Sequence, residues 1–375
     1  MKNEWQIHNP DGKPRVIVSK QLVGDRWLRI LTDAGCRVDV CTSTEILAKN
    51  DVIAAMEEGC GGAIGQLNEV WDREILARFK SVGGKVYSNV AVGYNNVDLV
   101  AATSFGILIG NTPGVLTETT AELTVALTFA VARRIAEADA YVRAGNFKSW
   151  QSNLFLGDLL RRKTLGVIGA GRIGSSYARM MAEGHRMNLM YFNPHRNKPL
   201  EDSFIEFNKF LTGVGEKPIQ CRRVETLEEL LREADVVSLH TTLNESTNHV
   251  IDARRLHQMK KNAILINVSR GPVIDERALV DHCLKNPEFR AGLDVFEHEP
   301  ELTAGLKELP NIVLLPHIGS ATHWTRQAMS TIAARNVAAV LSGYPVWKGE
   351  DMQLFLEDGA PKAAPSIVNA KELGL

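Results

Sequence analysis

Three side chains of the sequence have the chemistry needed to reduce a carbonyl group next to a carboxylate. Arg270 follows the apolar run AILIN, Glu299 lies in AGLDVFEHEP, and His317 follows the apolar run IVLL. Such a reduction needs a cation for the carboxylate and carbonyl, an acid for the developing alkoxide, and a carboxylate that keeps the acid charged. Arginine binds two oxygens in a fork that lysine cannot reproduce. Each residue taken alone is better explained without a catalytic role. Arg270 could be a surface arginine, Glu299 a rim carboxylate, and His317 a loop histidine with its hydrogen bonds satisfied.

A glycine fingerprint makes the three residues more informative together. GAGRIG at Gly169–Gly174 stands between the strand-like TLGVI and the helix-like RIGSSYARMMAEG. In that context glycines let backbone amides approach a pyrophosphate at a helix N-terminus. Gly169 would permit the turn, Gly171 the close approach, and Gly174 the contact between helix and strand. A purely structural glycine-rich turn is the alternative.

The stretch YFNPHR, Tyr191–Arg196, bears on the choice of cofactor. An NAD-binding unit usually places an acid about 20 residues beyond the fingerprint, where it holds the adenosine ribose. This chain has Asn193 there, then a histidine and Arg196, and we expect the next acid, Glu201, to lie too far along the chain. An uncharged residue beside an arginine favours the 2′-phosphate of NADP. The alternative is a solvated loop beside a site that still prefers NAD.

The elements that must position these residues form two series of strands alternating with helices. A length of 375 residues predicts two domains. Alternating strands and helices predict α/β domains with parallel sheets. The first series has β-branched runs at Arg15–Lys20, Cys36–Cys41, Gly62–Gly65, 85–93 and 107–111. The second has TLGVI, MNLMYF, DVVSLH, AILINVS, AGLDVF and IVLLPH.

Two further segments need their own interpretation. Thr117–Tyr141 is apolar around most of its circumference, which predicts a buried helix. It would serve either as an interdomain spine and subunit contact or as a plain core helix. Residues 197–226 exceed a usual connection, and we expect an added hairpin or helix-loop on the rim.

The composition excludes several classes of protein. A net charge of −1 and a pI near 6.8 favour neither nucleic acid nor an anionic membrane as a partner. The five cysteines lack the spacing of a zinc site or a disulfide framework, and we expect no metal. No apolar run reaches the length of a membrane span. The N-terminus lacks the pattern of a signal peptide, and KELGL lacks the Ser-Lys-Leu peroxisomal address, so we expect a cytoplasmic protein.

The motifs resemble those of the D-2-hydroxyacid dehydrogenase family. GAGRIG, NVSRGPVIDERALV, GLDVFEHEP and PHIGSAT match that family's signatures in order and spacing. The resemblance implies that Arg270 is the substrate-binding catalytic arginine, Glu299 its carboxylate and His317 the general acid/base. It also implies a substrate loop, VAVGYNNVD, whose amides at Val92 and Gly93 help to bind the substrate carboxylate. The same resemblance implies a set of cofactor-binding positions: Thr120, Gly169, Gly171, Arg172, Ile173, Gly174, Asn193, Arg196, Thr241, Val268, Ser269, Asp294 and Gly319.

The similarity extends over nearly the whole chain to the plant-type branch of that family, the hydroxypyruvate reductases. That branch has an aspartate where this chain has Asn193, so NADP(H) is favoured here and NAD(H) stays possible. The resemblance implies two Rossmann-like or flavodoxin-like domains with the active site in the cleft. Residues 1–120 plus 340–375 would bind the substrate, and 121–339 the dinucleotide. A homodimer is expected, with the spine helix and the segment around Trp150 in contact.

Several alternatives remain open at this level. Formate dehydrogenases pair their histidine with glutamine, and Glu299 argues against them. A 3-phosphoglycerate dehydrogenase would need a basic cluster, which VAVGYNNVD does not contain. Co-repressors that share the fold also keep the three side chains, so a nucleotide-sensing binding protein is the alternative from a different class. Hydroxypyruvate and glyoxylate are not distinguished as substrates, and Trp324 either lines the substrate pocket or packs in its helix.

Overall fold

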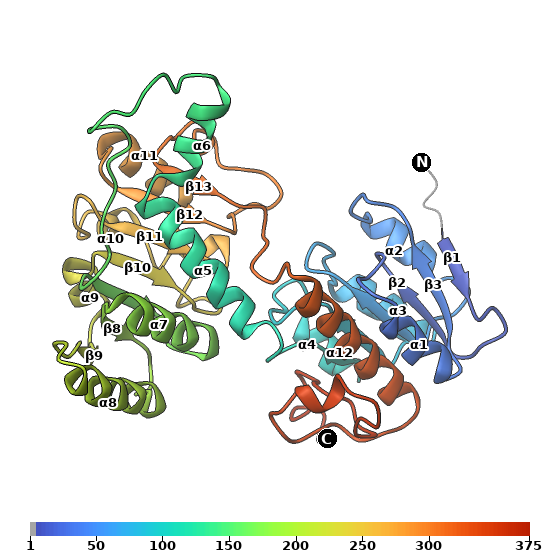
Figure 1. The fold of residues 1–375 in the computed structure, drawn as a ribbon. Helices are drawn as coiled ribbons and strands as arrows, with labels where there is room; N and C mark the ends of the chain where they lie inside the picture. Colours follow the sequence, from blue (N-terminus) through green and yellow to red (C-terminus); the bar gives the residue numbers. More distant parts are fainter. Residues whose placement is uncertain (1–4) are drawn as a thin grey trace. The chain divides into compact units, whose positions relative to one another are not determined.

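The chain divides into two units, each built around its own sheet, one mainly and the other entirely parallel (Figure 1). The computed structural model describes residues 5–375. One unit contains the chain up to Leu116 together with Ser320–Leu375, and the other contains Thr117–Gly319. The first four residues, part of the N-terminal stretch in which we saw no signal peptide, lie outside the described range.

The sheet of the first unit has the order β1-β3-β2-β4-β5-β6. Five of its strands are parallel and correspond to the five predicted runs: β2 (Arg15–Val18), β3 (Arg37–Cys41), β4 (Gly62–Gly65), β5 (Val86–Asn89) and β6 (Leu108–Gly110). The sixth, β1 (Trp5–His8), pairs antiparallel with β3 at the sheet edge and was not predicted. It is short and partly exposed, so it lacks the apolar run of the central strands.

Helices cover both faces of this first sheet. One face packs against α2 (Lys49–Ala55), α3 (Arg73–Ser81) and α4 (Leu99–Ser104). The other packs against α1 (Arg26–Asp33) and α12 (His323–Leu341). The short 3-10 helix η2 (Gln353–Phe355) lies in the C-terminal tail.

The position of α12 corrects the predicted domain boundary. We expected residues up to 339 to belong with the dinucleotide-binding part, but α12 belongs to the first unit. Its Ala333 and Val337 are fully buried in the same cluster as Val16 and Trp27. The tail continues this packing, because the side chain of Asn369 bonds to the backbone of β6 at Ile109 N. Sequence separation hid these contacts, since they join the two ends of the chain.

The sheet of the second unit has seven parallel strands in the order β13-β12-β11-β10-β7-β8-β9. The order reverses between β7 and β10, which is the topological switch point at which such sheets bind ligands. The predicted fold class is therefore confirmed. The strands are β7 (Thr164–Ile168), β8 (Asn188–Phe192), β9 (Cys221–Arg223), β10 (Val236–Leu239), β11 (Ile264–Asn267), β12 (Arg290–Leu293) and β13 (Ile312–Leu314).

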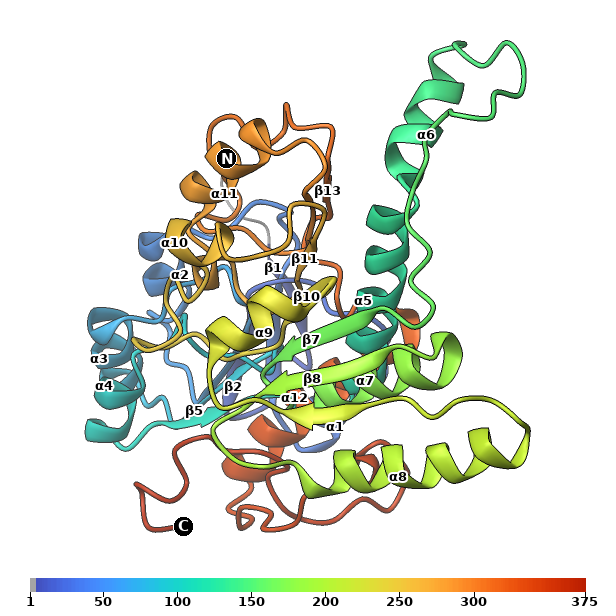
Figure 2. The same cartoon turned by 90° about the vertical axis from the view of Figure 1, so that its left-hand side faces the viewer.

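Two buried clusters hold the helices of this unit on the two faces of its sheet (Figures 1 and 2). One face packs against α5 (Thr117–Ala132), α7 (Arg172–His185) and α8 (Lys198–Gly213). The other packs against α9 (Leu227–Glu233), α10 (Ala253–Leu256) and α11 (Glu276–Lys285). A 3-10 turn, η1 (Gly271–Val273), follows β11.

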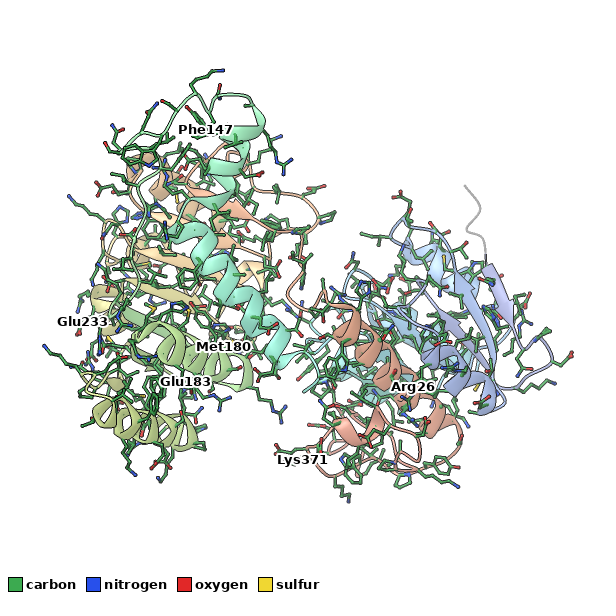
Figure 3. The ribbon with its side chains drawn as sticks, in the orientation of Figure 1. Arg26, Phe147, Met180, Glu183, Glu233 and Lys371 are labelled. Carbon is green, nitrogen blue, oxygen red and sulfur yellow. The ribbon has the colours of Figure 1, made fainter. Side chains whose placement is uncertain are left out.

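The predicted helix at 117–141 is two helices. It breaks at Arg134, whose backbone is left-handed with φ 54°, and continues as α6 (Ile135–Arg143). Seven residues of α5 are buried, as expected, whereas α6 has none, so the prediction of burial is wrong for α6. Figure 2 shows α6 and the loop after it extending away from the sheet, and Phe147 in that loop is labelled in Figure 3.

The polar excursion at 197–226 contains α8 followed by β9. The helix-loop interpretation is therefore closer than the hairpin, but β9 is not separate from the sheet. It pairs in parallel with β8 from Leu189↔Cys221 to Tyr191↔Arg223 and forms the sheet edge. None of the helices in the described part of the chain is both long and apolar enough to cross a bilayer.

Candidate active site

The glycine fingerprint forms the turn between β7 and α7. Gly169 has φ 92°, a conformation that favours glycine, and a Cβ there would lie 2.8 Å from the carbonyl oxygen of His240. A Cβ on Gly174 would lie 2.3 Å from the carbonyl oxygen of Gly169, so the helix can approach the turn only without a side chain. Gly171 is the N-cap of α7, and a Cβ there would meet nothing within 4 Å.

These features fit a dinucleotide phosphate. The amides of Arg172, Ile173 and Gly174 form the first turn of α7, where the helix dipole favours an anion. The space in front of Gly171 is open in the folded chain. Beside the turn, the buried hydroxyl of Thr241 has no hydrogen-bond partner among the described residues. Thr241 was a predicted cofactor-lining residue, and an unsatisfied buried hydroxyl is expected to find a partner.

The end of β8 differs from the prediction in one respect. Arg196 pairs with Glu201, with Nη2 2.6 Å from Oε2, and Glu201 also accepts a hydrogen bond of 2.6 Å from the Tyr191 hydroxyl. We expected Glu201 to lie too far from the strand end, but α8 turns back and brings it there. The Arg196 hydrogen bond lowers the pKa of Glu201, so this carboxylate is charged at neutral pH. Asn193 donates from Nδ2 to the carbonyl oxygen of His195 at 2.8 Å.

A second arginine at this strand end was not foreseen. Arg223 lies on β9, in register with Tyr191 of β8. Its Nε lies 3.3 Å from the carbonyl oxygen of Asn193, and its Nη1 pairs with Glu225 at 2.7 Å. The sequence could not indicate this neighbour, because β9 was not recognised as a strand of the sheet.

His317 and Glu299 form the predicted pair. His317 Nδ1 lies 2.9 Å from Glu299 Oε2, and about a third of each side chain is exposed. The other carboxylate oxygen, Oε1, accepts a hydrogen bond of 2.9 Å from the amide of Phe296. Burial alone would raise the pKa of Glu299, but the hydrogen bond and charge of His317, the Phe296 amide and the charge of Arg270 together lower it.

Asp294 holds the backbone that carries His317. Its Oδ1 accepts from the amide of Ile318 at 2.7 Å, and its Oδ2 accepts from the amide of Gly319 at 2.8 Å. His317 has φ 54°, which is unusual for a residue with a side chain. Two bonds to the next two amides hold that turn in place. Burial raises the pKa of Asp294 despite these bonds. A Cβ on Gly319 would lie 3.1 Å from Asp294 and 3.4 Å from Thr120, so these three predicted residues lie together.

Arg270 lies in a tight turn at the end of β11. Asn267, the last residue of that strand, donates from Nδ2 to the Arg270 carbonyl at 2.9 Å and accepts from the Ser269 amide at 3.0 Å. Asn267 fixes the turn through Val268 and was missed by sequence reasoning. Burial lowers the pKa of Arg270, an effect opposed by the charge of Glu299. An arginine nevertheless stays charged, so the site combines a cation, a carboxylate and a histidine.

The loops of Arg270 and Glu299 touch directly. A Cβ on Gly271 would lie 1.9 Å from the carbonyl carbon of Phe296, which leaves no room for a side chain. Beneath this contact, the amide of Glu297 donates to Glu276 Oε1 at 2.8 Å, and His249 Nε2 lies 2.6 Å from Glu297 Oε1.

Comparisons with known proteins identify the family of this chain. Residues 125–319 match the family described as "D-isomer specific 2-hydroxyacid dehydrogenase, NAD binding domain", which is more than half of the chain. The chain belongs to this family.

Relatives and solved structures extend the match beyond the NAD-binding domain. Glycerate dehydrogenase of Cucumis sativus is 51% identical over 98% of this chain and 98% of its own. Glycerate dehydrogenase HPR, peroxisomal, of Arabidopsis thaliana is 50% identical over 99% of this chain and 97% of its own. Glyoxylate reductase of Thermococcus litoralis is 43% identical over 72% of this chain and 78% of its own. The crystal structure of the TT0316 protein from Thermus thermophilus has a TM-score of 0.78, with 38% identity over 95% of this chain and 100% of its own.

The family membership makes the chain a 2-hydroxyacid dehydrogenase, an oxidoreductase with a nicotinamide cofactor. Its substrate is a small 2-keto acid, which is reduced to the 2-hydroxy acid. Arg270, Glu299, His317 and Asp294 all lie in the second unit of this dehydrogenase. Val92 and Gly93, the predicted substrate-loop residues, lie in the first unit. Trp324, at the start of α12, is 54% exposed, so it does not pack inside its own unit.

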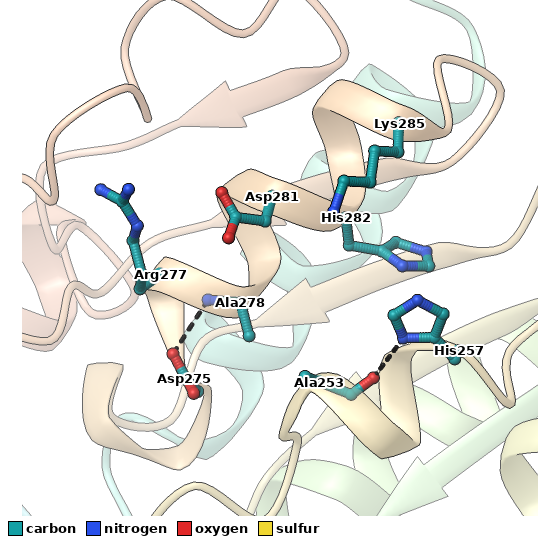
Figure 4. A pocket seen from close by; sticks show the side chains of 8 residues that line it. All are labelled: Ala253, His257, Asp275, Arg277, Ala278, Asp281, His282 and Lys285. Carbon is teal, nitrogen blue, oxygen red and sulfur yellow. Dashed lines mark hydrogen bonds between the residues drawn. The ribbon is translucent and has the colours of Figure 1, made fainter.

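A separate pocket of about 320 Å³ lies between α10 and α11 of the dehydrogenase (Figure 4). His257 and His282 line it, with ring centroids 5.4 Å apart, together with Asp275, Arg277 and Lys285. Burial lowers the pKa of His282, and the neighbouring His257 lowers it further. None of the predicted catalytic or cofactor-binding residues lines this pocket, so it is distinct from the site described above.

Alanine substitutions at two glycines of the turn, Gly171 and Gly174, should differ in their effect on stability. Gly171→Ala should leave the melting temperature unchanged but raise the dissociation constant for NADH and NADPH by about tenfold or more, because its Cβ fills open space that the phosphates approach. Gly174→Ala should lower both stability and affinity, because its Cβ meets backbone. Fluorescence of the bound reduced nicotinamide measures the affinity.

Gly184→Ala is the matched control for these variants. It lies in α7 with nothing within 4 Å of an added methyl group, so it should bind cofactor normally and gain about 0.5–1 kcal/mol of stability. Normal affinity in Gly171→Ala would show that the fingerprint does not contact the phosphates.

Proposed function

We propose that the chain reduces hydroxypyruvate to D-glycerate, and glyoxylate to glycolate. The observation that carries the proposal is the bonded pair His317–Glu299 with Arg270 in the adjoining turn. The names of its relatives, glycerate dehydrogenase and glyoxylate reductase, support these two substrates. Both substrates are small 2-keto acids, and both need a proton on the carbonyl oxygen as it is reduced.

Each residue of the trio has a separate part in this proposal. His317 uses Nδ1 for Glu299, which leaves Nε2 to give a proton to the substrate oxygen. Arg270 binds the carboxylate and polarises the carbonyl. Asp294 positions His317 through the amides of Ile318 and Gly319. Gly169–Gly174 would hold the pyrophosphate of a nicotinamide dinucleotide, which would supply the hydride when bound.

The activity is tested directly. Purified protein with hydroxypyruvate or glyoxylate should oxidise NADPH or NADH, followed by absorbance at the nicotinamide band. In Glu299→Gln, the group that holds His317 Nδ1 loses its charge, so kcat/KM for reduction should fall about tenfold or more. No oxidation of either cofactor by the wild-type protein would refute the proposal.

Glu297→Gln is the matched control for this measurement. It makes the same carboxylate-to-amide change at a second histidine pair, His249–Glu297, two residues away. Because this change lies outside the His317–Glu299 pair, kcat/KM should stay close to the wild-type value. An equal loss of kcat/KM in both variants would mean that the bond between Glu299 and His317 has no specific part in the reaction.

We further propose that the cofactor is preferentially NADP(H). Asn193 has no charge to repel a 2′-phosphate, and Arg196 and Arg223 are the cations beside it. Both arginines are paired with carboxylates, Glu201 and Glu225. The phosphate would therefore compete with these carboxylates for the guanidinium groups, which moderates the preference.

Two variants should shift the cofactor preference in opposite directions. Asn193→Asp with Arg196→Ala should move the ratio of kcat/KM values about tenfold or more toward NADH, because it adds a charge that repels the phosphate and removes a cation. Glu201→Gln should move the ratio several-fold toward NADPH, roughly the worth of one exposed ion pair. Lys198→Ala, which removes a cation paired only with Asp202, serves as the control. Equal ratios in all variants would contradict this reading of the strand end.

Homodimerisation is a third proposal. The arm formed by α6 and residues 144–160 carries six exposed apolar side chains: Ile135, Val142, Phe147, Trp150, Leu156 and Leu159. Trp150 is 82% exposed, and this number of exposed apolar side chains on one segment favours an interface.

Light scattering tests the dimer. The wild-type protein should have twice the chain mass of 41.3 kDa, and Trp150→Asp with Leu159→Asp should shift it toward a single chain, because charges on the arm oppose its burial. Val100→Asp, at an equally exposed apolar position on α4, should remain dimeric. A monomeric wild-type protein would rule the proposal out.

A further inference from the structure

The loop that follows β5 has three successive carbonyls held against the edge of the first sheet. The Ala91 carbonyl accepts from the amide of Thr112 at 2.9 Å. The Val92 carbonyl accepts from Asn111 Nδ2 at 2.9 Å, and the Gly93 carbonyl accepts from Asn89 Nδ2 at 2.9 Å. Asn89 is the last residue of β5, and Asn111 and Thr112 directly follow β6.

Because the peptide group is planar, these bonds also determine the direction of the amides. In a trans peptide the carbonyl of one residue and the amide of the next point in opposite directions. No cis bond occurs among these residues. The amides of Val92, Gly93 and Tyr94 are therefore directed away from the donors that hold the carbonyls. Within residues 5–375, none of these three amides donates a hydrogen bond to the protein.

The asparagine side chains that hold the loop are themselves fixed. Asn111 is 8% exposed, and its Oδ1 accepts from the hydroxyl of Ser366 at 2.6 Å. Asn89 is fully buried, and its Oδ1 accepts from the Tyr87 hydroxyl at 3.2 Å. Because a carbonyl can only accept, the side-chain nitrogen of each asparagine must face the loop. The C-terminal tail, through Ser366, thus supports the orientation of the loop.

We propose that Asn111 and Asn89 are positioning residues that present three amides, those of Val92, Gly93 and Tyr94, as one carboxylate-binding site. Successive amides that point the same way form concave anion sites. The loop is accessible, since Val92 and Tyr94 are 36% and 38% exposed. Asparagine suits this task, because aspartate in its charged form has no proton to donate to a carbonyl. The inference rests on the proposed function, which supplies a 2-keto acid as the carboxylate.

Amide chemical shifts test this inference on the full-length protein. Oxamate is a carboxylate that resembles glyoxylate but cannot be reduced. Titration with oxamate should shift the ¹H–¹⁵N signals of Val92, Gly93 and Tyr94 until the shifts reach a plateau. Asn111→Ala and Asn111→Leu should weaken oxamate binding about tenfold and raise KM for hydroxypyruvate by a similar factor, with a smaller change in kcat. NADPH affinity should not change, since the dinucleotide residues lie in the second unit.

The controls separate positioning from folding. Asn50→Ala, at an exposed asparagine of α2, should behave as the wild type. Tryptophan emission reports on the fold of the first unit, because the buried Trp27 and Trp71 both lie there. If Asn111→Ala fails to fold, Asn111→Leu keeps the branched shape of the side chain without the donor.

The outcomes for the two proposals differ. Amide shifts without turnover of hydroxypyruvate would leave the carboxylate site standing and refute the proposed function. Turnover with no shift at the three amides would refute the site alone. Folded Asn111 variants that bind oxamate as tightly as the wild type would show that the asparagine does not orient the loop.

Discussion

The turn that carries His317 depends on one buried carboxylate, which accepts hydrogen bonds from two backbone amides. Asp294, at the end of β12, bonds to the amides of Ile318 and Gly319, and so holds the left-handed turn at His317. Without that turn, nothing in the loop would place Nδ1 of His317 within 2.9 Å of Glu299. A histidine in this backbone conformation is strained. Two charge-assisted hydrogen bonds in a buried setting offset the cost of that strain.

The pKa values of the two carboxylates of the site are shifted in opposite directions, although burial raises both. The pKa of Glu299 is lowered, so its contribution to stability is present above the ordinary carboxyl range and is lost as pH falls through the lowered value. The pKa of Asp294 is raised, so its contribution is present below the ordinary range and is lost as pH rises through the raised value. At neutral pH the charge on Glu299 stabilises the fold, whereas the charge on Asp294 costs stability. The carboxylate of Asp294 nevertheless holds the turn at His317 through its two hydrogen bonds.

Much of the fold and of the site could be predicted from sequence, for a physical reason. The central strands are buried on both faces and read as continuous apolar runs, and the reactive side chains follow them directly. Contacts between distant parts of the chain were not visible. The edge strand β1 has no apolar run, and α12 packs on strands more than 200 residues earlier in the sequence. Glu201 reached the end of β8 because α8 turns back, which residue spacing alone does not reveal.

A single device recurs at the strand ends of both units. Asn89 is the last residue of β5, Asn267 is the last residue of β11, and Asn193 directly follows β8. Each donates from its side chain to a carbonyl of the turn that comes next. An asparagine can do this because its amide carries a donor and an acceptor on one short side chain. Asn193 stands where an acidic residue was expected. It also supports its turn through the bond to the His195 carbonyl. A charged aspartate could not make that bond, so the loss of the acid at this position comes with a gain in local order.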